Sequence, residues 1–137
     1  MASCGGATPH LLRAPFVYRI TLARDWECAL RDGYVARSPL DAADGFYHFS
    51  CAAQVAGTLA RFFAGASGLV LLQMRADSFA TRTLRFEHAA AVPGPNNLVP
   101  HLYVDRLPIS AVSAVIDISL DSGGGGAHVL SVAPNPS

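Results

Sequence analysis

The chain has 137 residues, enough for one domain, and 51% of them are hydrophobic, so it can bury a core. Ten arginines balance ten acidic residues, there is no lysine, and only 15% of the residues are charged. This composition argues against a basic protein that coats nucleic acid, and it excludes coiled-coil, collagen-like and wholly disordered chains.

Residues 1–14 are expected to form a disordered N-terminal tail, because Gly5-Gly6 and Pro9 interrupt any regular pattern. We expect no secretory signal, because the N-terminus lacks a charged start followed by a long apolar core, and no apolar run approaches the roughly 20 residues that span a membrane. Its three cysteines form neither a CxxC pair nor a dense framework. We therefore expect a cytoplasmic protein without a bound metal.

The folded domain, predicted over residues 15–121, begins with a strand at Phe16–Leu22. Side chains alternate in a strand, so Arg19 and Thr21 share one face of it. A short helix over Arg24–Arg31 should follow.

The middle of the domain has three predicted elements. The sequence SPLDAADGF (residues 38–46) is typical of a turn-rich connection, and Phe46–Ser50 predicts a short strand. Cys51–Ala64 has helical spacing, with Ser50 as its cap. Gly68–Met74 is a continuous apolar run, which predicts a central strand buried on both faces.

Three further strands are predicted, at Thr81–His88, His101–Val104 and Ala114–Leu120. Residues 122–137, which include GGGG and PNPS, are expected to be a disordered C-terminal tail. The total of about six strands and two main helices predicts an α+β domain.

The segment DGFYHFS (residues 44–50) carries the clearest chemical pattern, because His48 and Ser50 point the same way if this segment is a strand. An imidazole and a hydroxyl on one face can hold a ribose diol or an amide. The alternative is that Ser50 only caps the next helix and that His48 is a half-buried structural histidine.

Three other residues are candidates. His101 and Tyr103 share a face, where the tyrosine could stack on a flat base or a nicotinamide, or could simply lie on the sheet surface. Arg19 lies among apolar strand residues and needs an anionic partner, either Glu87 or a ligand phosphate. A nucleophilic pair of Cys51 and His48 is disfavoured, because alternation turns Cys51 away.

A set of short motifs occurs in order along Phe16–Val115, and together they resemble the domain-of-unknown-function family 952. The motifs are VYRIT, SPLD, DGFYHFS, ARFFAG, LVLL, LRFE and PHLY. That family resembles the ADP-ribosyltransferase-like superfamily and, within it, the RNA 2′-phosphotransferases. The resemblance implies a split, twisted β-core with a cleft that holds NAD.

Roles for particular residues follow from the resemblance. It implies that Arg19 stands at the first motif position, that His48 and Ser50 stand at the second, and that His101 stands at the third. The candidate catalytic residues are therefore His48, His101 and Glu87, and the candidate cofactor-binding residues are Arg19, Ser50 and Tyr103. The well-known transferases carry a glutamate at the third position. Phosphotransfer-type chemistry, hydrolysis of an ADP-ribose-related compound, and binding alone therefore stay open.

The function expected from this resemblance is binding of NAD or an ADP-ribose-like ligand, with transferase action on NAD as its enzymatic form. The alternative is a non-catalytic nucleotide-binding or protein-interaction module with the same fold. RNA, protein and small molecules all stay open as acceptors, whereas neither DNA nor a membrane is an expected partner. Convergence of Arg19, His48 and His101 on one pocket would favour ligand binding.

Overall fold

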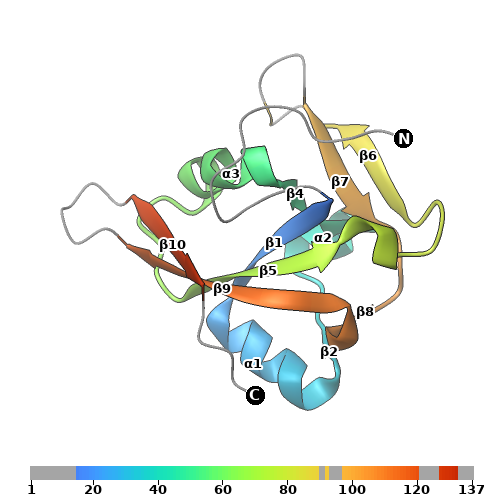
Figure 1. Ribbon diagram of the computed structural model, residues 1–137, viewed down its shortest axis with the longest axis horizontal. Coiled ribbons are helices and arrows are strands. Elements are labelled where there is room, and N and C mark those ends of the chain that lie inside the picture. Colours follow the sequence, from blue (N-terminus) through green and yellow to red (C-terminus); the bar gives the residue numbers. More distant parts are fainter. Residues whose placement is uncertain (1–14, 90–91, 93–96, 121–126, 133–137) are drawn as a thin grey trace.

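The computed structural model describes residues 15–89, 92, 97–120 and 127–132 (Figure 1). The helices are α1 (Ala23–Asp32), α2 (Pro39–Asp44) and α3 (Val55–Phe62), with short 3-10 helices at Ala52–Gln54, Ala76–Ser78 and Ile109–Ala111. The strands are β1 (Phe16–Leu22), β2 (Tyr34–Val35), β3 (Tyr47–His48), β4 (Ser50–Cys51), β5 (Leu69–Arg75), β6 (Leu84–His88), β7 (Leu98–Leu102), β8 (Leu107–Pro108), β9 (Val112–Leu120) and β10 (His128–Val132). The α+β class predicted from the sequence is confirmed.

The strands form a five-stranded antiparallel sheet, ordered β10-β9-β5-β1-β4, and a three-stranded antiparallel sheet, ordered β3-β7-β6. A third, two-stranded sheet pairs β2 with β8. Strand β5 lies at the centre of the large sheet, and Leu71 and Leu72 on it are fully buried. The continuous apolar run therefore correctly predicted a central strand.

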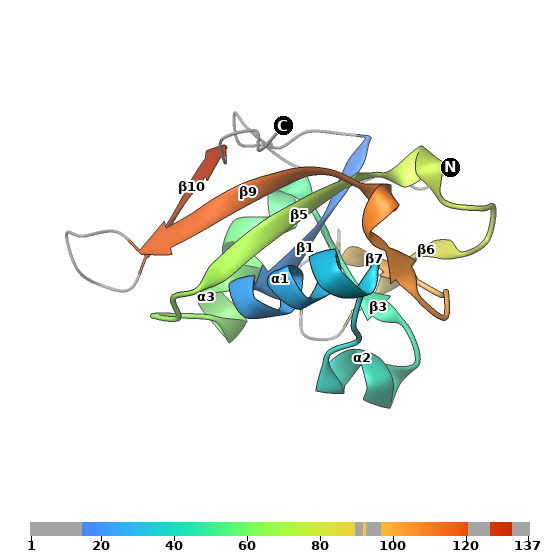
Figure 2. The same cartoon turned by 90° about the horizontal axis from the view of Figure 1, so that it is seen from below.

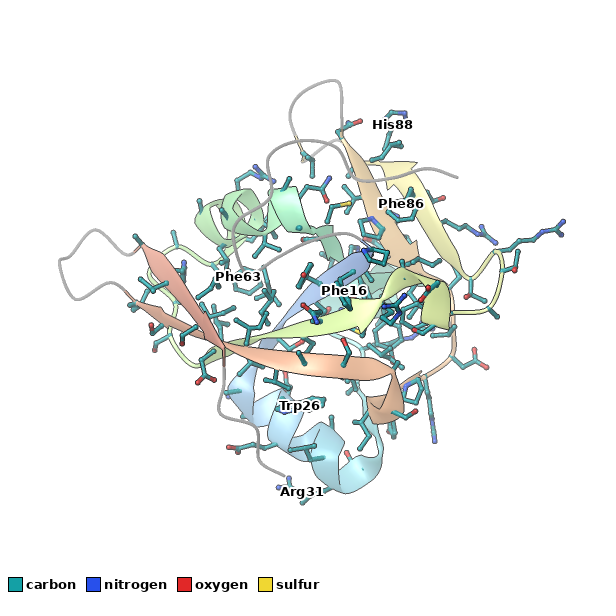
Figure 3. The ribbon with its side chains drawn as sticks, viewed as in Figure 1. Phe16, Trp26, Arg31, Phe63, Phe86 and His88 are labelled. Atoms are coloured by element: carbon teal, nitrogen blue, oxygen red, sulfur yellow. The ribbon has the colours of Figure 1, made fainter. Side chains whose placement is uncertain are left out.

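Both faces of the large sheet are covered. On one face, Trp26 and Ala29 of α1 pack with Val17 and Leu72. On the other face, α3 packs against Leu71, and Phe63 joins this second cluster. Figure 3 shows Trp26 and Phe63 on opposite sides of the sheet. Helices α1 and α3 are both amphipathic, because each buries one apolar stripe against this sheet.

The segment from β3 to β4 links the two larger sheets. Strand β3 pairs with β7, whereas β4 pairs with β1, and between them the Phe49 amide donates to the Pro100 carbonyl at 3.1 Å. The predicted strand Phe46–Ser50 is thus two short strands in two different sheets. Strand β4 pairs only with Val17 and Tyr18, so the rest of β1 has no strand neighbour on that side within the described ranges.

The predicted turn-rich connection is wrong, because it contains helix α2. Ser38 caps this helix by a capping box with Asp41, and Pro39 occupies its first turn. Gly45 ends it with φ of +84°, a conformation that glycine adopts without strain. Helix α2 projects from the body of the molecule in Figure 2.

The start of the next helix also differs from its prediction. Cys51, not Ser50, precedes a 3-10 turn, and α3 begins only at Val55. Gln54 accepts a hydrogen bond from the Cys51 amide at 2.8 Å, which satisfies a donor at this end. Ser50 is therefore not the helix cap, and this leaves its hydroxyl available for other contacts.

Strand boundaries and the C-terminal segment need smaller corrections. Strand β6 begins at Leu84, because Thr83 closes a turn on the Ala80 carbonyl, and β7 starts at Leu98. The expected C-terminal tail contains β10, which pairs with β9 and whose Leu130 packs on the second cluster. The predicted tail residues 1–14, 122–126 and 133–137 lie outside the described residues. None of the helices in the described ranges is long and apolar enough to span a membrane.

Candidate functional site

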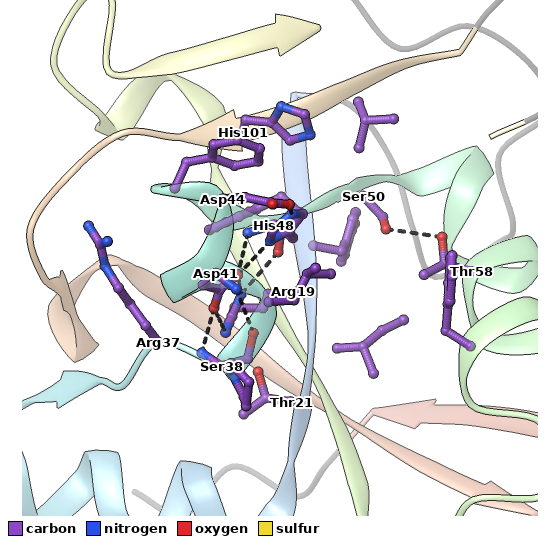
Figure 4. A pocket seen from close by; sticks show the side chains of 18 of the residues that line it. Arg19, Thr21, Arg37, Ser38, Asp41, Asp44, His48, Ser50, Thr58 and His101 are labelled. Atoms are coloured by element: carbon purple, nitrogen blue, oxygen red, sulfur yellow. Dashed lines mark hydrogen bonds and ion pairs between the residues drawn. The ribbon is translucent and has the colours of Figure 1, made fainter. Parts of the chain in front are cut away.

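A pocket of about 940 Å³ lies beside the part of β1 that β4 leaves unpaired (Figure 4). Such a volume is within the range of pockets that hold small-molecule ligands. Side chains from β1, α1, α2, β3, β4, α3 and β7 line it, so the junction between the two larger sheets forms most of its walls. Arg19, His48, Ser50 and His101 all line this pocket, whereas Glu87 and Tyr103 do not.

Arg19 makes a buried ion pair with Asp41. One guanidinium nitrogen lies 2.6 Å from Asp41 Oδ2, and the other lies 3.4 Å from Oδ1 and donates to the His48 carbonyl at 3.1 Å. Arg19 is 6% exposed and Asp41 is fully buried. The expectation that Glu87 or a ligand phosphate would pair with Arg19 is therefore wrong, because Asp41 neutralises it.

Asp41 is the acceptor that ties the cluster together. Its carboxylate also accepts hydrogen bonds from the backbone amides of Ser38 and His48, at 2.8 and 3.0 Å. Burial would raise the pKa of this carboxyl, but the hydrogen bonds from His48 and Arg19 outweigh burial and hold the pKa far below its usual range. Asp41 is therefore ionised at every physiological pH.

His48 lies between two carboxylates. Its Nδ1 is 2.7 Å from Asp41 Oδ1, and its Nε2 is 2.8 Å from Asp44 Oδ2. Burial would lower the pKa of His48, but the hydrogen bonds to Asp41 and Asp44 outweigh it and raise the pKa. Because Asp41 and Asp44 engage both of its ring nitrogens, His48 links α2 to β3, and a ligand reaches Nε2 only by displacing the exposed Asp44.

His101 lies beside His48, with their ring centroids 5.7 Å apart. Its Nδ1 is 2.9 Å from Glu87 Oε1, and the Tyr103 hydroxyl donates to the same oxygen at 2.7 Å. The hydrogen bonds from Tyr103 and His101 lower the pKa of Glu87, and the bond to Glu87 raises the pKa of Tyr103. Glu87 and Tyr103 thus bond to each other, Glu87 also bonds to His101, and neither Glu87 nor Tyr103 lines the pocket; their predicted roles toward a ligand stay predictions.

Ser50 and Thr21 supply hydroxyl groups to the pocket. The Ser50 hydroxyl is 3.4 Å from that of Thr58 on α3. Thr21 is 6% exposed, and its hydroxyl has no hydrogen-bond partner in the described ranges; the same holds for Arg19 Nε. A buried polar group without a partner costs about 1–3 kcal/mol. Both unsatisfied atoms belong to residues that line this one pocket.

The remaining lining is largely apolar, with charges near the exposed part. Ile20, Phe46 and Phe63 contribute to it, and Leu40 and Phe62 are 58% and 60% exposed. Exposed Arg37 also lines the pocket; its guanidinium donates to the Val104 carbonyl at 2.8 Å, outside the lining, and has no ion-pair partner in the described part of the chain. The buried charges of Arg19 and Asp41 compensate each other, whereas the exposed Arg37 and Asp25 line the pocket without an ion-pair partner in the described ranges.

The sequence analysis missed Asp41, Asp44, Thr21 and Arg37. A signal for Asp41 existed, because Ser38 and Asp41 have the S-x-x-D spacing of a capping box. Asp44 follows one helical turn later, which puts both carboxylates within reach of one histidine. Cys51 does not line the pocket.

A metal site is not evident in the described ranges, since no group of three or more His, Cys, Asp or Glu side chains is arranged to hold an ion. The pocket instead combines a polar floor, formed by Arg19, His48, Ser50 and His101, with an apolar wall that includes Phe46 and Phe63. Such a pocket suits a ligand that combines flat rings with hydroxyl groups.

Comparison with known proteins gives a family and a structural relative. Residues 20–115 match the family described as "Protein of unknown function (DUF952)". The crystal structure of protein CC0527 from Caulobacter crescentus is 32% identical, with a TM-score of 0.73, covering 83% of this chain and 93% of that one. The solution NMR structure of CC0527 gives a TM-score of 0.69, also at 32% identity, covering 81% and 90%. No curated protein matches the chain. The chain therefore belongs to the DUF952 family.

Proposed function

We propose that the pocket binds NAD or an ADP-ribose-like ligand, and that the chain belongs with the ADP-ribosyltransferase-like superfamily. The observation that carries the proposal is the convergence of Arg19, His48 and His101, from three separate motifs, on one pocket. Asp41 binds both Arg19 and His48, whereas His101 comes from β7 of the other sheet, so the pocket combines polar groups from the two larger sheets.

The chemistry of the pocket supports a dinucleotide-type ligand. Its apolar wall, with Phe46 and Phe63, suits a flat ring, which is stabilised by stacking and burial. Hydroxyl and imidazole groups from Ser50 and His101 suit ribose hydroxyls. Arg37 suits a phosphate, because its planar guanidinium can donate two parallel hydrogen bonds.

The roles differ from those first expected. Arg19 is committed to Asp41, so we assign it to the scaffold of the pocket and give the phosphate contact to Arg37. His48 is held by two carboxylates, so it also supports the pocket floor. His101 then becomes the imidazole for which a direct ligand contact is proposed.

Calorimetric titration with NAD, ADP-ribose and a 2′-phosphorylated nucleotide tests the proposal. We expect at least one of the three to bind wild-type protein and raise its melting temperature by mass action. Arg37→Gln should weaken binding about tenfold, since it loses a charge-assisted hydrogen bond. The matched control is Arg24→Gln on exposed α1, which should bind as wild type. Absence of binding to all three ligands by the wild-type chain would refute the proposal.

Release of nicotinamide from NAD separates an enzyme from a binding module. An enzyme releases nicotinamide with at least one acceptor, and His101→Ala abolishes this release. A binding module titrates with NAD but leaves it intact with RNA, protein and small-molecule acceptors. The binding titration is needed with this assay, because it shows whether NAD binds when no nicotinamide is released.

A further inference from the structure

The imidazole of His101 is held on three sides and open on the fourth. Glu87 Oε1 occupies Nδ1 at 2.9 Å, and Phe46 stacks on the ring with centroids 4.1 Å apart and an interplanar angle of 28°. The His48 ring approaches with its edge. Only 10% of the His101 side chain is exposed, yet Nε2 has no hydrogen-bond partner in the described part of the chain.

We propose that His101 Nε2 is the ligand-facing hydrogen-bond acceptor of the pocket, and that Glu87 is the positioning residue that keeps its lone pair free for a ligand hydroxyl. The inference rests on the proposed function for the identity of the ligand. It assigns Glu87 an action through His101, because Glu87 itself does not line the pocket.

The hydrogen bonds around Glu87 determine where the proton of His101 lies. The Tyr103 hydroxyl and His101 Nδ1 both approach the same Glu87 oxygen, so this oxygen accepts from both. The lowered pKa of Glu87 keeps it ionised and able to accept. A neutral imidazole has one proton, and a proton on Nδ1 leaves Nε2 as an acceptor.

The choice of a hydroxyl follows from this acceptor and its neighbours. Nε2 needs a donor, and the adjacent His48 does not supply one, because its two ring nitrogens face Asp41 and Asp44. A carboxylate or phosphate oxygen would offer Nε2 only another acceptor. Ribose hydroxyls can donate, so His101 should select the sugar part of the ligand rather than its phosphates.

Nitrogen-15 NMR of the ligand-free protein at alkaline pH, where imidazoles are neutral, tests the role of Glu87. The wild type should show the Nδ1-protonated tautomer, and Tyr103→Phe should keep it. Glu87→Gln should give a mixture, because an amide can donate as well as accept. Glu27→Gln, the same change on exposed α1, is the control and should match wild type. An Nε2-protonated wild-type ring would overturn the inference.

The ligand contact is tested on the same samples. ADP-ribose should shift the Nε2 resonance, and one analogue lacking a single ribose hydroxyl should bind about tenfold more weakly to the wild type. That difference should disappear in His101→Ala. Binding without a shift of Nε2 would overturn the inference and leave the proposed function intact. An Nδ1-protonated ring without any ligand binding would support the role of Glu87 and refute the proposed function.

Discussion

Asp41 holds the candidate site together, since its one carboxylate binds Arg19, His48 and the start of its own helix. The group is fully buried, so its charge is stable only while these partners remain. Arg19 depends on it in turn, because a buried guanidinium without a carboxylate is costly.

Replacing Asp41 should therefore remove a large part of the stability of the domain. Asp41→Asn should lower the free energy of unfolding by about 3 kcal/mol, because it leaves the Arg19 charge buried and unpaired. Urea denaturation measures this loss. The control Asp77→Asn breaks the exposed pair with Arg75 and should stay close to wild type. Equal effects of the two substitutions would contradict the central role of Asp41.

His48 makes the stability depend on pH in a defined direction. Its pKa is raised in the folded chain, so its contribution is complete below the unfolded value of about 6.5 and is lost as pH rises through the folded pKa. Denaturation at increasing pH should show this decline in the wild type and a smaller one in His48→Gln. His88→Gln, on exposed β6, is the control and should decline as the wild type does.

At the scale of elements, α2 is the part that brings carboxylates to the pocket. It has only six residues, so its capping box and Gly45 decide whether it forms. Ser38→Ala should cost about 1 kcal/mol and loosen the contact of Asp44 with His48. The melting temperature and the His48 ring resonances measure the two effects. Ser67→Ala, in an exposed loop, should change neither.

The elements that could be predicted from the sequence are those with a regular hydrophobic pattern. The patterns of Phe16–Leu22 and Gly68–Met74 reflect burial within the large sheet, and the helical spacing after Cys51 reflects burial of α3 against it. Helix α2 was missed because its six residues make fewer than two helical turns, too few to show a helical repeat of apolar residues. Strand β10 was missed because the glycine run before it is typical of a disordered tail. Its strand forms only by pairing with β9.

The candidate site was predictable only in part, for a similar reason. Arg19, His48, Ser50 and His101 line one pocket, as the motifs suggested, but their partners could not be read from the sequence. An arginine in a strand requires an anion, and only the folded chain shows that this anion is Asp41 rather than Glu87. The alternation of side chains also did not indicate that Tyr47–Cys51 crosses from one sheet to another.

For the whole molecule, the strand order of the large sheet predicts which backbone amides exchange most slowly with solvent. Backbone amides of β5 and β1 lie at its centre between two hydrophobic clusters, whereas β10 is an edge strand with exposed Val129. Hydrogen exchange should be slowest in β5 and faster in β10. Exchange in β10 as slow as in β5 would contradict this arrangement.

The central claim is that the junction of the two larger sheets is a ligand site, and amide chemical-shift mapping with ADP-ribose tests it most directly. We predict that the perturbed amides gather on the unpaired part of β1, on Ser50 and around His101, with β9 and β10 unaffected. Perturbations that lie away from this pocket, or none at saturating ligand, would contradict the account.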